Sequence, residues 1–159
     1  MDVFNGRHAV VTGAGSGIGR SITQRLARDG ARVALLGRRA AKLEETCSLM
    51  QTEGEASSHL IIPTDIGDQD QVASAAYTVQ TEFGGVDMLV NCAGTVSNTP
   101  AIDSEFGDWV EPIRVNFLGT VHCCRAFVPL MSEGGRVVNI TSIHRDRVEK
   151  DGSAYAAAR

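Results

Sequence analysis

The segment Thr12-Gly13-Ala14-Gly15-Ser16-Gly17-Ile18-Gly19 follows the apolar run His8-Ala9-Val10-Val11 and leads into a helical pattern. Glycine adopts positive φ without steric cost and lets the backbone approach a ligand closely. The helix that follows offers unpaired N–H groups and the positive end of its dipole to an anion. We therefore predict a dinucleotide pyrophosphate site at this turn, although any tight strand-to-helix turn uses glycine too. The predicted contacts are Gly13, Gly15, Ser16, Gly17, Ile18 and Gly19.

The composition bounds the class of protein. The chain has 159 residues, of which 43% are hydrophobic and 21% charged, which suits one globular domain over residues 1–159. A formal net charge of -4 leaves no basic field for nucleic acid. A strand candidate begins within a few residues of Met1 without a leader, and no apolar run approaches the ~20 residues that span a bilayer. We expect a cytoplasmic protein with no nucleic-acid or membrane partner.

The four cysteines form no C-x-x-C pair, and the histidines show no metal-ligand spacing. Cys123 and Cys124 lie inside an apolar helical pattern. We expect reduced thiols in or near the core, with neither a disulfide framework nor a metal site.

Strand and helix signals alternate along the chain, which predicts an α/β fold with a doubly wound parallel sheet of the Rossmann type. Apolar runs such as Val86 to Val90 and Val137 to Ile140 are typical of strands buried on both faces. Glycines follow several helical segments where a left-handed cap is expected, namely Gly30, Gly54, Gly84-Gly85 and Gly134-Gly135. The predicted strands are Ala9–Val11, Ala31–Leu36, His59–Ile62, Val86–Val90 and Arg136–Ile140, and the predicted helices are Ile18–Asp29, Ala40–Glu53, Gln69–Phe83 and Asp108–Met131.

The last predicted helix carries an apolar stripe whose spacing is compatible with a core-facing surface, with only some members left for an interface. These residues are Trp109, Ile113, Phe117, Leu118, Val121, Phe127 and Leu130.

The end of the second predicted strand bears on the choice of cofactor. A dinucleotide fold that prefers NAD usually has a carboxylate there for the adenosine ribose. This strand ends in Gly37-Arg38-Arg39, whose guanidinium groups suit a 2′-phosphate. We predict NADP in preference to NAD; the alternative is that both arginines only solvate the start of the next helix.

Asp65 follows the third predicted strand and is placed in the cofactor site together with Ile66. Its carboxylate is suited to accept a hydrogen bond from the adenine amino group. The alternative interpretation is an aspartate that caps a helix or a turn.

These motifs resemble those of the short-chain dehydrogenases/reductases. Thr12 to Gly19 is similar to that family's Thr-Gly-x-x-x-Gly-x-Gly motif, and Asn91-Cys92-Ala93-Gly94 is similar to its Asn-Asn-Ala-Gly motif. The resemblance implies an oxidoreductase that acts on a ketone, a secondary alcohol, a sugar or a 3-oxoacyl thioester. It adds Asn91, Ala93 and Gly94 to the cofactor site, and implies a catalytic set of Asn116, Ser142, Tyr155 and Arg159.

The chemistry explains the tyrosine, since reducing a carbonyl with a nicotinamide requires a proton as well as a hydride. Tyr155 is the implied acid. Lowering a tyrosine pKa from about 10 toward neutrality takes about 3 units, or roughly 4 kcal/mol, of stabilisation by nearby positive charge. In the family a lysine one helical turn later supplies that charge, whereas this chain has Arg159. The resemblance further implies that Ser142 binds the substrate oxygen and that Asn116 organises a water.

Arginine keeps the positive charge but does not pass a proton along a relay. An impaired, nucleotide-binding pseudoenzyme is therefore the alternative function. Family members continue beyond this point with two more strands, so we expect the chain to be a fragment. If it were the entire polypeptide, the predicted strand Arg136–Ile140 would be an open sheet edge. The resemblance also implies a homo-oligomer that pairs through the long helix.

Overall fold

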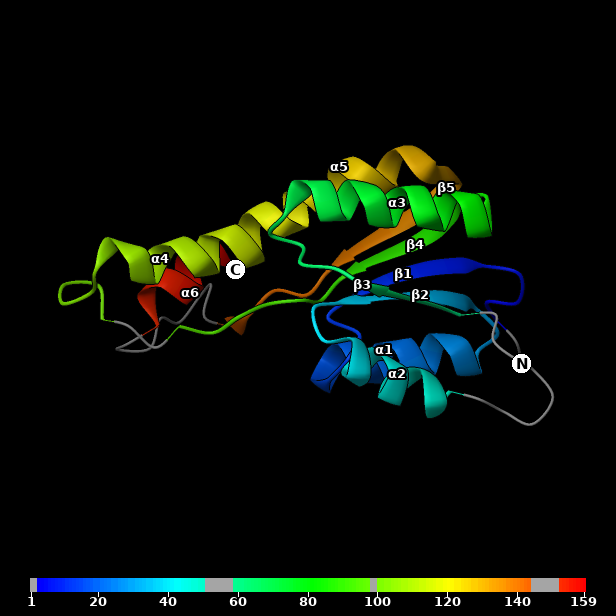
Figure 1. Ribbon diagram of the computed structural model, residues 1–159, viewed down its shortest axis with the longest axis horizontal. Helices are drawn as coiled ribbons and strands as arrows, with labels where there is room; N and C mark the ends of the chain where they lie inside the picture. Colours follow the sequence, from blue (N-terminus) through cyan, green and yellow to red (C-terminus); the bar gives the residue numbers. More distant parts are fainter. Residues whose placement is uncertain (1–2, 51–58, 98–99, 144–151) are drawn as a thin grey trace.

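The computed structural model describes residues 3–50, 59–97, 100–143 and 152–159. Five parallel strands form one sheet in the order β3-β2-β1-β4-β5 (Figure 1). The strands are β1 (His8–Thr12), β2 (Arg32–Gly37), β3 (Leu60–Pro63), β4 (Val86–Asn91) and β5 (Met131–Asn139). This arrangement confirms the predicted doubly wound α/β fold.

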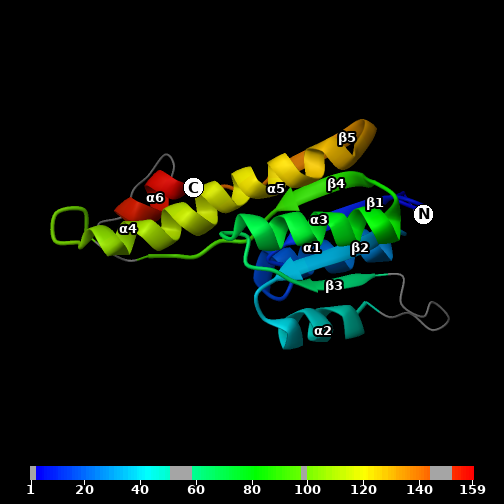
Figure 2. The same cartoon turned by 45° about the horizontal axis from the view of Figure 1, so that its top comes forward.

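The helices cover both faces of the sheet (Figures 1 and 2). One face carries α1 (Gly17–Arg28) and α2 (Ala40–Ser48), and the other carries α3 (Gln69–Phe83) and α5 (Gly119–Phe127). Each face has its own buried apolar cluster, because side chains of a central strand alternate between the two faces. Val10 of β1 belongs to the cluster under α3 and α5, whereas Val11 belongs to the one under α1 and α2.

The remaining helical segments lie toward the carboxyl ends of the strands or follow α5. α6 (Ser153–Ala158) packs against α4 (Phe106–Pro112) beyond the carboxyl ends of the strands (Figure 1). Because β1 pairs with β2 on one side and β4 on the other, the chain winds in opposite directions from β1. A crevice at the carboxyl ends of strands is the usual ligand site at such a switch point.

The predicted helix Asp108–Met131 is in fact four consecutive segments. α4 passes into a π-helical segment, η1 (Ile113–Leu118), then into α5 and a short 3-10 segment, η2 (Val128–Leu130). A π-helix advances the chain by an extra residue per turn, so a stripe that assumes a constant 3.6-residue period loses its phase here. The core-facing prediction was wrong for most of its members: Phe127 is buried, Trp109 and Leu130 are half-buried, and Ile113, Phe117, Leu118 and Val121 are exposed.

The last strand also differs from its prediction. β5 starts at Met131, where a helix end was expected, and its register with β4 shifts between Val86 and Met88. The predicted cap at Gly134-Gly135 was wrong, because these residues lie within β5, where Gly134 takes φ 86°. An irregular ladder absorbs extra residues through such a conformation.

Burial of β5 on both faces was wrong as well, since Val137 and Val138 are 40% and 49% exposed. Among the described residues β5 pairs only with β4, so it lies at the edge of the sheet. The glycine caps at Gly30 and Gly84 are confirmed by φ values of 96° and 76°. Gly54 and the last residues of the predicted helix Ala40–Glu53 lie outside the described residues, and α2 ends at Ser48.

Two glycines with open space around their Cα atoms test whether the left-handed conformation at the end of α3 requires glycine. Gly84 caps α3 in the left-handed region, whereas Gly107 lies in the first turn of α4 without a positive φ, and a Cβ would meet nothing within 4 Å at either site. We expect Gly84→Ala to lower the free energy of unfolding by about 1 kcal/mol and Gly107→Ala to leave it unchanged or raise it by about 0.5 kcal/mol. Urea denaturation measures both. Equal losses for the two variants would contradict the cap.

Candidate functional site

The glycine turn after β1 is packed too tightly for side chains. Gly13 takes φ 69°, and a Cβ on it would lie 2.8 Å from the Cα atom of Ala93. A Cβ on Gly19 would collide with the carbonyl oxygen of Gly13. Gly17 has φ 52° with open space around it, so conformation alone favours glycine there. The turn therefore holds its backbone against the segment that follows β4.

Three polar side chains fix this turn. The Thr12 hydroxyl oxygen accepts hydrogen bonds from the backbone N–H groups of Cys92 and Ala93, each at 3.0 Å. Arg20 donates to the Gly15 carbonyl at 2.7 Å, and the Thr46 hydroxyl donates to the Ala14 carbonyl at 3.0 Å. The sequence analysis did not single out Arg20 or Thr46, because their roles depend on contacts between α1 and α2.

The first turn of α1 is available to a ligand. Ser16 is the N-cap residue, but its side chain makes no capping hydrogen bond. The first N–H groups of any helix lack partners within the helix. The positive end of the α1 dipole therefore lies at the glycine turn, as an anion site requires.

A cavity of about 420 Å³ lies at the carboxyl ends of the strands, beside the glycine turn. It brings together nine of the predicted cofactor residues: Gly13, Gly15, Ser16, Arg38, Arg39, Asp65, Ile66, Ala93 and Gly94. Residues that the sequence analysis did not assign to the site complete its lining, namely Gly37, Lys42, Leu43, Thr64 and Val115.

Four predicted cofactor residues do not line this cavity. Gly17 and Ile18 lie on an apolar depression on the outer side of α1, and Gly19 is buried behind Gly13. Asn91 is buried at the end of β4, where its amide donates to the Asn139 side chain at 2.9 Å. Asn91 therefore joins β4 to β5 rather than forming the cavity wall.

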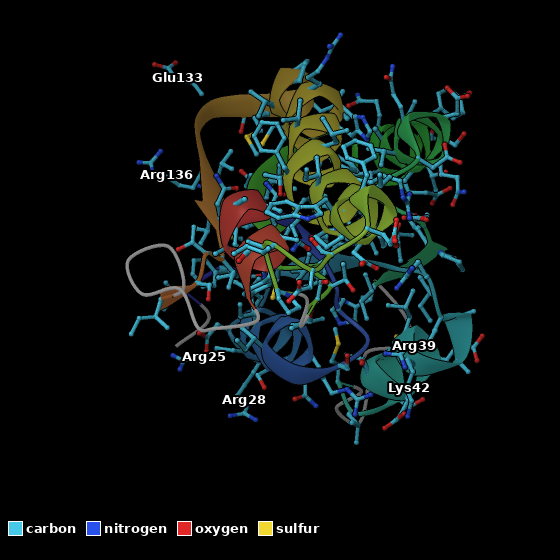
Figure 3. All side chains as sticks on the ribbon, turned by 90° about the vertical axis from the view of Figure 1, so that its left-hand side faces the viewer. Arg25, Arg28, Arg39, Lys42, Glu133 and Arg136 are labelled. Atoms are coloured by element: carbon cyan, nitrogen blue, oxygen red, sulfur yellow. The ribbon has the colours of Figure 1, made fainter. Side chains whose placement is uncertain are left out.

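One side of the cavity is cationic. Arg38, Arg39 and Lys42 line it, and Figure 3 shows Arg39 and Lys42 next to each other at the start of α2. Lys42 donates to Glu45, which also accepts from Arg20, both at 2.8 Å. These hydrogen bonds, with Arg20 the stronger, lower the pKa of Glu45 to about 2. Arg39 forms no ion pair with any described residue, so its charge is available to a ligand.

Asp65 lies on the cavity wall and also holds a turn. It lines the cavity, and its carboxylate accepts hydrogen bonds at 3.0 Å from the Gly67 backbone N–H and from Arg114. Burial raises the pKa of the Asp65 carboxyl, but Arg114 and the Gly67 N–H outweigh burial and hold it below its usual value. Asp65 therefore stabilises its turn, while Asp68 is the N-cap residue of α3.

Tyr155, Arg159 and Ser142 come together near the Ala93–Gly94 end of the cavity. Tyr155 lies in α6, and the phenol shares hydrogen bonds with both Arg159 and Ser142. Burial raises the pKa of Tyr155, but these two hydrogen bonds and the charge of Arg159 outweigh it and lower the pKa. The Arg159 guanidinium also donates to the Ala93 carbonyl at 3.3 Å.

Asn116 holds the same end of the cavity from the π-helical segment. Its side-chain amide donates to the Thr95 carbonyl at 2.9 Å and its oxygen accepts from the Thr95 N–H at 2.8 Å. A Cβ on Gly94 would lie 2.9 Å from an Arg159 nitrogen and 3.2 Å from the Asn116 oxygen. Asn116 and Arg159 thus contact the backbone from Ala93 to Thr95, and Tyr155 joins them through Arg159.

Among residues 3–50, 59–97, 100–143 and 152–159, no group of His, Cys, Asp and Glu side chains could hold a metal ion. The same residues contain no helix with the length and apolar character needed to cross a bilayer. The four cysteines are free thiols, and Cys47 and Cys123 are buried.

The Tyr155–Arg159 pairing can be tested directly, because the chain has only two tyrosines and Tyr77 is 76% exposed. In a Tyr77→Phe background, ultraviolet titration of tyrosinate reports on Tyr155 alone. We expect Arg159→Gln to raise the Tyr155 pKa, since it removes the hydrogen bond and the positive charge, and Arg159→Lys to raise it less. An unchanged pKa in Arg159→Gln would contradict the pairing.

Comparisons with known proteins agree with this geometry. A family model described as short chain dehydrogenase matches residues 7–159. An uncharacterized oxidoreductase of Staphylococcus aureus strain USA300 is 35% identical over 161 residues, which cover 100% of this chain and 68% of the relative.

Two solved structures have the same fold. A short-chain dehydrogenase/reductase from Burkholderia phymatum in complex with NAD superposes with a TM-score of 0.91 at 30% identity, covering 99% of this chain and 57% of that one. A short-chain dehydrogenase from Burkholderia cenocepacia in complex with NADP gives 0.89 at 33% identity, covering 98% and 64%. The chain thus spans about two thirds of the relatives it matches. The family match, these similarities and the shared fold show that this chain belongs to the short-chain dehydrogenases/reductases.

Proposed function

We propose that the protein is an oxidoreductase that transfers a hydride between NADP(H) and a carbonyl or secondary alcohol of the ketone, sugar or 3-oxoacyl class. One observation carries this proposal. The phenol of Tyr155, with its lowered pKa, stands with Ser142 and Arg159 near the Ala93–Gly94 end of a cavity that the glycine turn also lines.

The residues present fit a nicotinamide dinucleotide. The turn from Gly13 to Ser16 presents backbone without side chains at the start of α1, where a pyrophosphate is favoured. Ile66 and Val115 offer apolar contacts to an adenine ring, and Ala93 and Gly94 lead toward Tyr155. When bound, the nicotinamide supplies or accepts the hydride.

The cationic side of the cavity supports NADP(H) over NAD(H). Arg38 and Arg39 follow β2, where an NAD site usually presents a carboxylate, and both line the cavity. A guanidinium group binds a phosphate through charge-assisted hydrogen bonds. NAD(H) remains the less favoured cofactor in this proposal; of the two Burkholderia structures, one holds NAD and the other NADP.

The side chains divide the proton chemistry among them. Tyr155 donates a proton to the carbonyl oxygen in reduction, and Ser142 hydrogen-bonds that oxygen. Arg159 supplies the positive charge that lowers the Tyr155 pKa, and Asn116 holds the backbone at Thr95 that borders the site. Because a guanidinium does not release its proton, the proton that Tyr155 gives up must return from water or another group.

A second candidate is a nucleotide-binding protein that does not turn over. Arg159 favours it, because arginine stands in the lysine position and its Nε atom is buried without a hydrogen-bond partner. An unsatisfied buried donor is costly, so this guanidinium is not ideally seated in the present arrangement. The two candidates differ in turnover and not in cofactor binding.

Turnover separates them. We expect NADPH oxidation with at least one member of a panel of ketones, sugars and 3-oxoacyl thioesters. Tyr155→Phe should lower kcat by about 100-fold or more, since it removes the acid. Tyr77→Phe on the surface of α3 is the matched control and should leave kcat unchanged. NADPH binding without turnover on the whole panel would favour the second candidate.

We also propose that the protein pairs with a second copy of itself through α4, η1 and α5. Exposed apolar side chains recur there every three or four residues, and polar solvent does not favour such a series. They are Phe106, Val110, Ile113, Phe117 and Val121.

A charge at the α5 end of this series should break the pairing. We expect Val121→Asp to reduce the molar mass measured by light scattering to that of a monomer, because a carboxylate cannot be buried without a partner. Tyr77→Asp, which places the same charge on another exposed apolar residue, should leave the mass of the assembly unchanged. Identical masses for both variants would contradict an interface at α5.

A further inference from the structure

Four charged side chains form a network along the cationic side of the cavity. They are Arg38 after β2, Asp65 after β3, Glu111 in α4 and Arg114 in η1, and we call them the charge network. The Glu111 carboxylate lies between the two arginines. It is 3.6 Å from an Arg38 nitrogen and accepts hydrogen bonds at 2.8 and 3.0 Å from Arg114.

Glu111 is held firmly on one side and loosely on the other. Arg114 binds it through two hydrogen bonds and is itself held by Asp65 at 3.0 Å and packed against Gly67. The Arg38 contact is longer, and the Arg38 and Glu111 side chains are 60% and 46% exposed. Exposed pairs contribute little to stability, so a stronger anion can take Arg38 from Glu111 at small cost.

The carboxylate nevertheless stays beside Arg38 when that happens, because Arg114 keeps it in place. A 2′-phosphate carries between one and two negative charges near pH 7 and would bind close to a fixed negative charge. A ribose hydroxyl carries no charge and meets no such repulsion. The charge of Lys42 does not fully offset the repulsion between Glu111 and the phosphate, since Lys42 is already paired with Glu45.

We propose that Glu111 is a specificity-determining residue, which weakens the binding of NADP(H) relative to NAD(H) by competing with the 2′-phosphate for Arg38. This inference rests on the proposed function, since it assumes that the cavity binds the dinucleotide. Glu111 acts through Arg38 and does not line the cavity, so it is a positioning residue rather than a catalytic one.

Dissociation constants for NADPH and NADH, measured by nicotinamide fluorescence, test the proposal without turnover. We expect Glu111→Gln to tighten NADPH binding about three- to tenfold while changing NADH binding less than about twofold. The gain should shrink as salt rises, because exposed charges are screened. Glu82→Gln is the matched control: it removes the same charge from an exposed site in α3, and it should alter neither constant.

A double-mutant cycle identifies the route. In an Arg38→Gln background, Glu111→Gln should improve the NADPH to NADH ratio less than it does in the unaltered protein, since the competition for Arg38 is gone and only the direct repulsion of the phosphate by Glu111 remains. An unchanged ratio in Glu111→Gln alone, with both cofactors still bound, would overturn this inference and leave the proposed function standing. Failure of the unaltered protein to bind either cofactor would overturn both.

Discussion

The arrangement of the site depends on the close approach of the Gly13 turn to the backbone of Ala93. β1 and β4 are paired in parallel, and beyond their ends the Thr12 hydroxyl continues the pairing by accepting two N–H groups. Only a residue without a Cβ lets the turn come this close. The same contact fixes the start of α1 relative to Gly94, so the glycine turn and the end of the cavity beside Arg159 are positioned together.

Most of the fold and part of the site were predictable from the sequence, because their signals are local. Apolar runs bounded by glycine predicted the strands, and Gly84 predicted the end of α3 through its left-handed conformation. The cavity residues after β1, β2 and β3 agree with the rule that ligands bind at the carboxyl ends of parallel strands, whereas Ala93 and Gly94 after β4 were predicted from the resemblance to the family. Ser142, Tyr155 and Arg159 carry no such local signal, so only the resemblance to the family predicted that they meet.

The features that escaped prediction depend on contacts between distant segments. The π-helical turn at Asn116 cannot be inferred from a 3.6-residue period, and it rotates Phe117 and Val121 out of the core. The turn widens where the Asn116 side chain forms two hydrogen bonds with Thr95, a residue 21 positions earlier. The charge network is likewise built from four elements, and neither Glu111 nor Arg114 belongs to any motif.

Arginine at position 159 changes how the lowered pKa of Tyr155 is maintained. An arginine side chain stays charged at every pH at which proteins are folded. The electric field of Arg159 at the phenol is therefore constant with pH and depends only on geometry. That geometry comes from α6, which packs against α4 and η1, and from the Ala93 carbonyl, which accepts from the guanidinium at 3.3 Å. The acidity of the phenol is therefore coupled to the π-helical segment. A substitution that straightened this segment would move α6, and with it the charge that Tyr155 requires.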